Sequence, residues 1–581
     1  MTAVHDPRTV LAARLQSAVA KAFGAEHASV DPMVRRSERA DFQADLAMGL
    51  AKTLKRAPRQ VAEAVVAAAD FTDVADRVEI AGPGFINLTL KNAFLESALQ
   101  EVVRDERVGV PLAAEKDRVV IDYSSPNVAK EMHVGHLRST IIGDALARVL
   151  EFLGHEVIRQ NHIGDWGTPF GMLIEHLLDV GEGGAQADMG ELSEFYRAAR
   201  AKFDGDPKFA DRARQRVVLL QAGDKHTLDL WRQVIELSKR YFSQLYERLG
   251  VGLRSEHVRG ESSYNDALAD VAAELERKGL ARISDGALCA FPPGFTNRDN
   301  EPLPLIVRKQ DGGYGYAATD LAALRYRTQV LRGTRLLYLV GAPQAQHLAM
   351  VFAVGAQVGW LAPPARAEHV AFGAVLGSDK KILKSRAGEA VRLTDLLAEA
   401  VERADAELVR REPDRDAAVR RVLAPQIGIG AVKYADLAND RIKDYVFDWD
   451  RMLAAEGRTG PYLQYAHARI RSIFRKGAET GVELRAGSAI QVGEPAERRL
   501  GLALLDFGDA VVETGATLRP HRLCGYLFDL ATAFTGFFET CPVLKAPDEA
   551  SRASRLALCE LTARVLARGL DLLGIAAPQR M

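Results

Sequence analysis

Cysteine and long apolar runs are both scarce in this sequence. Its 581 residues include only four cysteines, scattered along the chain with no C-x-x-C pair. This distribution argues against zinc ribbons and a disulfide framework and is typical of a reducing compartment, so we expect a cytoplasmic protein. No stretch reaches roughly 18 uncharged apolar residues, and the first residues lack the apolar core of a signal peptide. We therefore expect no membrane-spanning helix.

An excess of one charge is also missing. The 76 Lys and Arg residues are balanced by 77 Asp and Glu residues, which leaves a net charge of −1. A polyanionic partner would therefore have to be met by local basic patches, because global charge cannot attract it. The contents of 48% hydrophobic and 26% charged residues are those of a soluble globular chain of several domains.

Three units with different patterns follow one another, which predicts a multidomain α/β fold. Residues 1–115 combine helical spacing of apolar residues with two strands joined by Gly-Pro-Gly, typical of a small α/β domain. Residues 116–405 alternate strands, loops and helices, which predicts a Rossmann-like doubly wound parallel sheet with a helical insertion at about 185–250. Residues 406–581 carry long amphipathic patterns and little strand signal, which predicts an all-α domain.

The stretch SSPNVAKEMHVGHLRST at 124–140 follows a predicted strand and holds Lys130, His133, Gly135 and His136. In a doubly wound sheet, ligands bind beyond the carboxyl ends of the strands, where this stretch falls. A helix that begins near His133 would offer unpaired amides and a positive dipole end to phosphates. Gly135 would let a flat base approach, and the two histidines would share one helical face. The alternatives are a zinc site, which lacks a third ligand, and an ordinary turn.

Further motifs give this stretch its context. PNVAKEMHVGH, GDWGTPFG and KKILKSRAG resemble class I aminoacyl-tRNA synthetases, which carry a His-Ile-Gly-His loop and a Lys-Met-Ser-Lys-Ser loop. AGPGFINL, YAATDLAALRYR, QAQHL, GPYLQYAHARI and the final Arg-Met resemble the arginyl-tRNA synthetase family more closely, so that the resemblance runs from about residue 30 to the end. It implies an enzyme that activates L-arginine with ATP and Mg²⁺ and transfers it to tRNA(Arg). It also implies a monomer without a structural metal, and pyrophosphate exchange that needs tRNA.

The resemblance assigns roles to residues of the two loops. The residues that it implies in catalysis are Lys130, His133, His136 and Lys384, and those in ATP binding are His133, Gly135, His136, Lys384, Ser385 and Arg386. The segment KKILKSR can be aligned in two registers. In one register, Lys381-Ile-Leu-Lys384-Ser385 matches Lys-Met-Ser-Lys-Ser. In the other, which we favour, Lys384-Ser385-Arg386 matches a family variant that lacks the second lysine, and Lys130 substitutes for it.

Selection of arginine requires carboxylates, because a guanidinium carries five donors and a fixed charge. The sequence offers Asp122, Glu261 and Asp320. The resemblance adds Tyr316 and Gln344, with Asn127 and His133 near the backbone groups of the substrate. Tyr316 and Asp320 are four residues apart and would share one face of a helix. A pocket of this kind rejects analogues by hydrogen bonding, so we expect no editing site in the insertion.

The resemblance also implies where tRNA binds. It implies that the tRNA elbow meets Phe85 and Asn87, and that the anticodon meets Tyr462, Gln464, Tyr465 and Met581. Aromatic faces and amides suit single-stranded RNA, although aromatic residues on an amphipathic helix often belong to the core. Three other functions compete: a synthetase for glutamine, glutamate or cysteine, a small nucleotidyltransferase that uses no tRNA, and a catalytically silent RNA-binding paralogue.

Overall fold

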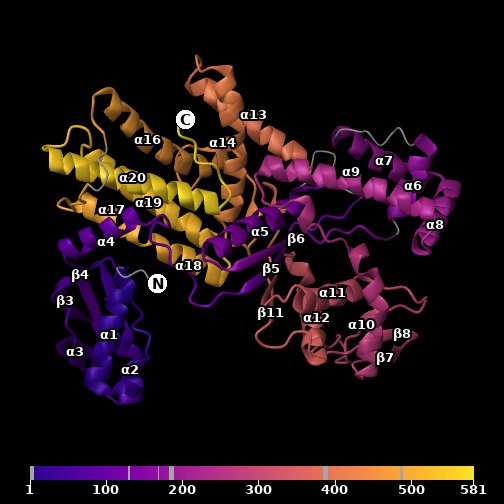
Figure 1. The fold of residues 1–581 in the computed structure, drawn as a ribbon, viewed down its shortest axis with the longest axis horizontal. Coiled ribbons are helices and arrows are strands. Elements are labelled where there is room, and N and C mark those ends of the chain that lie inside the picture. Colours follow the sequence, from indigo (N-terminus) through magenta and orange to yellow (C-terminus); the bar gives the residue numbers. More distant parts are fainter. Residues whose placement is uncertain (1–5, 129–130, 168, 182–188, 384–389, 484–487) are drawn as a thin grey trace.

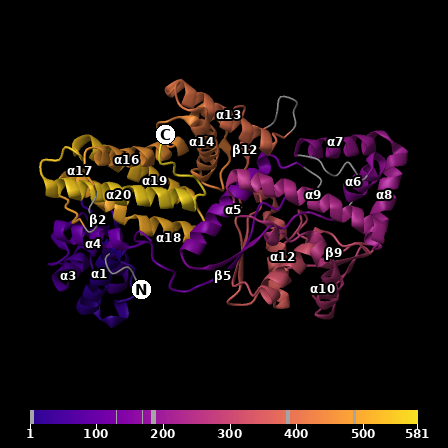
Figure 2. The same ribbon diagram turned by 45° about the horizontal axis from the view of Figure 1, so that its top comes forward.

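The computed structural model describes residues 6–128, 131–167, 169–181, 189–383, 390–483 and 488–581. Figure 1 shows the N-terminal unit (indigo) beside the C-terminal helices (orange to yellow), with the helices that follow α6 (Pro169–Val180) at the opposite end. The parallel strands lie between these two ends, and the turned view of Figure 2 preserves this arrangement. No helix of the described residues is long and apolar enough to cross a membrane.

The N-terminal unit is a four-stranded antiparallel sheet covered by helices. Its strands lie in the order β1-β2-β4-β3. Pro58 begins a new helix where the sequence predicts a break, because a proline ring fits the first turn of a helix but not its interior. The elements are α1 (Pro7–Phe23), β1 (Arg35–Arg36), β2 (Phe42–Ala44), α2 (Leu46–Leu54), α3 (Pro58–Ala68), β3 (Ala75–Ala81), β4 (Phe85–Leu90) and α4 (Asn92–Arg104).

A four-stranded parallel sheet of order β11-β10-β5-β6 forms the centre of the molecule, as the sequence predicts. Successive residues of its strands face opposite sides. Thus Val119 and Ile121 pack in the core that includes α5, while Val120 packs in a second core with α11 and α12. The elements are β5 (Arg118–Asp122), α5 (Val134–Phe152), β6 (Glu156–Gln160), α11 (Tyr316–Arg325), β10 (Arg335–Tyr338), α12 (Ala345–Val358) and β11 (Arg366–His369).

Two further groups of elements interrupt this alternation. The predicted charged helical segment contains three helices after α6, whereas the small antiparallel sheet β7-β8-β9 has no counterpart in the sequence expectations. A π-helical turn (Tyr326–Val330) follows α11. The elements are α6 (Pro169–Val180), α7 (Met189–Gly205), α8 (Pro207–Gln221), α9 (Lys225–Leu249), η4 (Glu261–Tyr264), α10 (Asn265–Arg277), β7 (Ala281–Ser284), β8 (Ala287–Ala290) and β9 (Leu305–Arg308).

The C-terminal part is a bundle of helices, as its amphipathic patterns predict. The boundary expected between residues 405 and 406 falls inside α13. The short strands β12 and β13 pair in parallel and connect the bundle to the loops beyond the central sheet. The elements are β12 (Val375–Leu376), α13 (Leu393–Arg411), α14 (Ala417–Leu437), β13 (Tyr445–Val446), α15 (Trp449–Leu453), α16 (Gly460–Glu479), α17 (Pro495–Leu505), α18 (Phe507–Thr517), α19 (His521–Thr540) and α20 (Glu549–Leu572).

A buried ion pair joins helix α5 to the bundle. Nε of Arg138 lies 3.2 Å from Oδ2 of Asp436 on α14, and the two side chains are 1% and 0% exposed. The same guanidinium donates to the carbonyl of Lys443, 2.9 Å away. Removal of one partner of such a pair leaves an uncompensated buried charge, so the pair fixes where α5 lies relative to α14.

Candidate active site

The two histidines of the motif build the first turn of α5. His133 is the N-cap residue, in an extended conformation, so it precedes the helix and does not share a helical face with His136 as the spacing suggested. Its Nδ1 accepts from the amide of Gly135 at 3.0 Å, and Nδ1 of His136 accepts from the amide of His133 at 3.1 Å. This is a reciprocal capping box made of imidazoles.

The capping bonds also decide which ring nitrogen carries the proton. In a neutral imidazole one nitrogen is an acceptor and the other is a donor. Because Nδ1 of His133 and of His136 both accept, each ring carries its proton on Nε2. The rings lie close, with centroids 4.2 Å apart. The helix start therefore combines two Nε2–H donors with the positive end of the helix dipole, which is an arrangement suited to phosphate oxygens.

Gly135 is required by packing as well as by access. A Cβ atom at this position would lie 2.7 Å from Cε1 of the His133 ring, closer than real Cβ contacts occur. A side chain here would therefore displace the histidine from its capping position. The residue is also exposed, which leaves the backbone accessible to a ligand.

The turn between β5 and this helix is held in an unusual backbone conformation. Ser124 and Ser125 have φ values of +70° and +45°, which non-glycine residues adopt rarely and which cluster at functional sites. The amide of Ser124 donates to the hydroxyl of Ser139, and the amide of Ser125 donates to Oδ1 of Asn161. The chain is thus redirected at the strand end and locked there by side chains of two neighbouring elements.

A pocket of about 450 Å³ opens beside the first turn of α5. Its walls are mostly apolar, as a flat heteroaromatic ring requires. They come from the helix start, from the loop after β10 and from the segment around β12: His133, Val134, Gly135, Arg138, Gly341, Ala342, Pro343, Phe372, Gly373, Ala374, Val375, Ile382, Leu383, Ala390 and Asp444. Ile382 and Leu383 belong to the KKILKSR segment, so the two predicted loops border one pocket.

Carboxylates gather where α11, η4 and the loop after β6 meet. Burial, together with the negative charges of Asp165 and Asp320, raises the pKa of Glu261 to about 7. Asp165 is held by the amide and the hydroxyl of Ser262 at 2.8 and 2.7 Å, and burial raises its pKa as well. Burial lowers the pKa of His162, which lies beside the same acids, so this ring stays neutral. A cluster of this kind suits a bound cation.

Asp122 does not fit its predicted role as a ligand of arginine. It is buried, and its Oδ2 accepts from the guanidinium of Arg327 at 2.7 Å, while its Oδ1 accepts from the hydroxyl of Ser125 at 2.7 Å. The charge of Arg327 holds the pKa of this carboxyl below its usual range against the opposing effect of burial. Arg327 also donates to Gln160 and lies over the Tyr338 ring, so it joins the ends of three strands.

The other residues assigned to arginine lie on α11, at the start of α12 and in the loop after β5. Tyr316 begins α11 and is 69% exposed, and Asp320 is half-buried one turn later on the same helix, as predicted. Gln344 is exposed at the N-cap of α12, and Asn127 is exposed in the loop after β5, where it bridges to Gly164. Four residues assigned to catalysis or ATP fall outside the described residues: Lys130, Lys384, Ser385 and Arg386.

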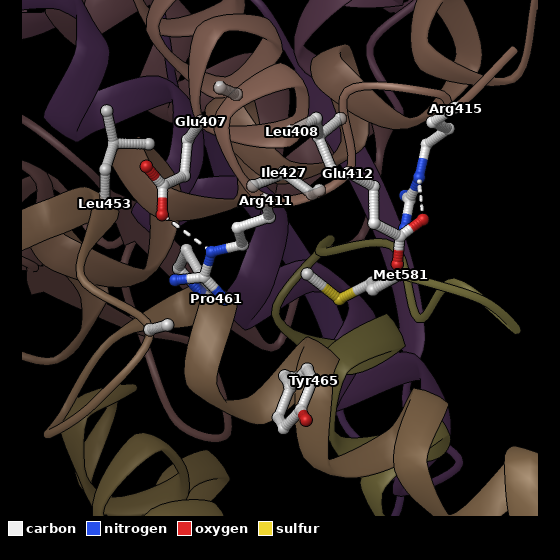
Figure 3. Close-up of a pocket in the computed structure, with 12 residues that line it drawn as sticks. Glu407, Leu408, Arg411, Glu412, Arg415, Ile427, Leu453, Pro461, Tyr465 and Met581 are labelled. Atoms are coloured by element: carbon white, nitrogen blue, oxygen red, sulfur yellow. Dashed lines mark hydrogen bonds and ion pairs between the residues drawn. The ribbon is translucent and has the colours of Figure 1, made fainter.

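A second pocket, of about 240 Å³, lies in the helical bundle. Figure 3 shows the Tyr465 ring and the Met581 side chain directed into it, with Ile427 of α14 on the opposite wall. Ion pairs on its rim join Arg411 to Glu407 and Arg415 to Glu412. Tyr465 is 40% exposed, and the guanidinium of Arg469 lies over its ring, 5.4 Å from the centroid, so the residue could serve as a stacking platform.

Two neighbours of Tyr465 on α16, Tyr462 and Gln464, do not line this pocket. Gln464 is 0% exposed, and its amide donates to the carbonyls of Gln426 and Ala576 at 2.9 Å each. It ties α14, α16 and the C-terminal segment together, so the predicted contact of Gln464 with tRNA does not fit the structure. Tyr462 is half-buried against the core and packs on Phe528, with ring centroids 5.6 Å apart.

The sheet of the N-terminal unit carries Phe85 and Asn87 on one face, where Asn87 is buried with 6% exposure. Ile86 and Leu88 alternate with them and are fully buried, which places Phe85 and Asn87 on the opposite side of β4. Phe85 is half-buried, and Asn87 accepts from Gln43 of β2 at 2.9 Å.

Comparison with known proteins agrees with this geometry along the whole chain. Residues 98–449 match the family model described as tRNA synthetases class I (R), catalytic domain. Residues 463–581 match the DALR anticodon binding domain, and residues 9–90 match the arginyl tRNA synthetase N terminal domain.

Relatives and solved structures of the same length agree as well. The arginine–tRNA ligase of Thermobifida fusca is 59% identical over 99% of this chain and 100% of the relative, and that of Frankia casuarinae is 51% identical over 96% of each. The arginyl-tRNA synthetase structure from Plasmodium falciparum superposes with a TM-score of 0.84 at 30% identity over 99% of both chains. The Thermus thermophilus structure gives 0.83 at 26% identity over 99% of this chain and 100% of that one.

The parallel sheet, the histidine-capped helix and the matched catalytic model define a class I aminoacyl-tRNA synthetase. Within that class the chain belongs to the arginyl-tRNA synthetase family. The predicted family and enzyme class, arginine–tRNA ligase, are therefore confirmed, and they are favoured over a synthetase for glutamine, glutamate or cysteine.

Proposed function

We propose that the cleft beyond the central sheet performs both steps of arginine–tRNA ligation. In the first step a carboxylate oxygen of L-arginine attacks the α-phosphorus of ATP, and pyrophosphate leaves with its Mg²⁺. In the second step a hydroxyl of the terminal ribose of tRNA(Arg) attacks the carbonyl carbon, loses its proton, and AMP leaves. The observation that carries this proposal is that a histidine-capped helix start and a cluster of carboxylates both lie beyond the ends of the parallel strands.

The nucleotide is positioned by the start of α5. The base enters the apolar pocket beside Gly135, and the Nε2–H groups of His133 and His136 donate to phosphate oxygens. Donors that are fixed before the reaction stabilise charge as it redistributes between attacking and leaving oxygens. In this proposal the remaining contacts with the phosphates of ATP come from Lys130, Lys384, Ser385 and Arg386.

Arginine is selected by charge and fork geometry. Asp320 and Glu261 meet the guanidinium, the Tyr316 ring covers it, and Gln344 and Asn127 lie near the α-amino and carboxylate groups. His133 lies between the two substrates. Asp122 acts indirectly in this proposal, because it holds Arg327 and with it the strand ends.

The three units divide the contacts with tRNA. Residues 1–115 meet the elbow through the Phe85 and Asn87 face, and residues 116–405 hold the reacting end. Residues 406–581 meet the anticodon through Tyr465 and Met581, together with Tyr462 of the same helix as Tyr465. The enzyme works as a monomer in this proposal, because a single chain contains all three units that contact the tRNA. The helical insertion carries no editing site, because the acidic pocket itself rejects analogues that lack the guanidinium charge.

The test is a charging assay with ATP, unfractionated tRNA and each labelled amino acid in turn. Arginine alone should become acid-precipitable. Asp320→Asn keeps the shape but removes the charge, and hydrogen bonds to charged groups are worth roughly 1.5 to 3 kcal/mol, so the KM for arginine should rise about ten- to a hundred-fold with little change for ATP. Charging of another amino acid would refute the specificity, and an unchanged arginine KM would place Asp320 outside the pocket.

A further inference from the structure

His347 is connected to both residues of α11 that face the guanidinium in the proposed function. It lies in the first turn of α12, three residues after Gln344. Its Nε2 lies 2.6 Å from Oδ2 of Asp320, and its ring meets the Tyr316 ring edge-on, with centroids 4.8 Å apart and planes at 64°. The sequence motifs assign His347 no role in the selection of arginine.

The bond restricts a carboxylate that would otherwise rotate. Asp320 is 25% exposed and His347 is 15% exposed, so the contact is partly shielded from water. Among the described residues, His347 is the hydrogen-bond partner that the structure gives the Asp320 carboxylate. A hydrogen bond to an ionised carboxylate is short and directional, and a group held before binding loses less entropy when the ligand arrives.

We propose that His347 is a positioning residue for arginine selection. Its Nε2–H donates to Oδ2 of Asp320 and thereby presents Oδ1 to the guanidinium, while its ring limits rotation of the Tyr316 ring. His347 acts through these two residues and does not itself touch the reacting atoms. This inference rests on the proposed role of Asp320.

The test compares two amides of different reach. The side-chain nitrogen of glutamine reaches the position of Nε2, whereas that of asparagine reaches only the position of Nδ1. His347→Asn should therefore raise the arginine KM about tenfold, the scale of one lost charge-assisted bond, with the ATP KM within about twofold of wild type. His347→Gln should restore most of the affinity. His155→Asn is the control, because this half-buried histidine accepts from the Asp117 amide at the opposite end of the sheet.

A double-mutant comparison separates positioning from general structural damage. In the Asp320→Asn background, His347→Asn should add less than about twofold to the arginine KM, because the charge to be positioned has gone. Equal effects in both backgrounds, or equal loss in the Gln and Asn variants, would overturn the proposal. If Asp320→Asn itself leaves the arginine KM unchanged, the proposed function of Asp320 fails instead, so the two failures are distinguishable.

Discussion

Binding of arginine should release a proton from Glu261. In the empty pocket burial and the charges of Asp165 and Asp320 raise the pKa of this carboxyl to about 7, so near neutral pH about half of the molecules hold it protonated. A guanidinium beside it favours the ionised form. The substrate cation therefore replaces a proton, which limits the change in net charge inside the pocket.

The magnitude follows from linkage. If Glu261 is ionised in the complex, the apparent Kd contains the factor 1 + 10^(pKa − pH), so a pKa of about 7 weakens arginine binding about tenfold between about pH 8 and about pH 6. The raised pKa of Glu261 also makes the stability of the fold depend on pH, in the opposite direction to that of an acid paired with a cation. The folded-state pKa is above the usual 4.5, so the empty protein binds the extra proton and loses this stabilisation as pH rises through 7.

Calorimetric titration of the protein with arginine, in buffers of different ionisation enthalpy, measures the released protons directly. Wild type should release about half a proton per arginine near pH 7. Glu261→Gln should bind more weakly, release almost none and lose the pH dependence of Kd between 8 and 6. His162 is not the source of this proton, because burial lowers its pKa and the ring is already neutral. Equal proton release in the variant, or none in wild type, would refute the reasoning.

Three further predictions concern other parts of the chain. Asp436→Asn leaves the Arg138 charge buried without its partner, so the free energy of unfolding in urea should fall by about 3 to 5 kcal/mol, and an unchanged midpoint would contradict this. Tyr465→Ala should raise the tRNA KM about five- to a hundred-fold at unchanged arginine KM, because stacking of one base is worth roughly 1 to 3 kcal/mol; a wild-type tRNA KM would return the ring to the core. Lys130→Ala should slow single-turnover adenylate formation by about 10²-fold and more than Lys384→Ala does, and the reverse order would favour the other register of the loop.

The sequence patterns predict the architecture well because they are local. A short apolar run marks β5 and the 3.6-residue period marks α5, so the start of that helix near His133 could be predicted within the motif. The same reasoning placed both histidines on one helical face. It could not foresee that an imidazole acts as N-cap, because the capping partner is decided by side-chain rotamers.

Partners that are distant along the chain account for what the sequence did not predict. Asp122 and Arg327 are separated by 205 positions, so nothing near Asp122 indicates that an internal guanidinium occupies it. Gln464 lies on an amphipathic helix, where an amide is expected at the surface, but the returning chain at Ala576 covers it. His347 stood within the quoted QAQHL motif, yet its role depends on the approach of α12 to α11.

Helix α5 connects the chemistry of the cleft to the helical bundle. Its first turn carries the two imidazoles beside the proposed nucleotide pocket, and Arg138, one turn further on, is held by Asp436 of α14. At a rise of 1.5 Å per residue, Asp436 lies about 14 Å along α14 from Ile427, which lines the pocket of Tyr465. Helix α14 thus borders the proposed anticodon site at one place and holds α5, the helix proposed to bind ATP, at another. The expected need of pyrophosphate exchange for tRNA would follow if occupation of the bundle pocket moves α14, because α5 is bound to it by a charge pair that is costly to break.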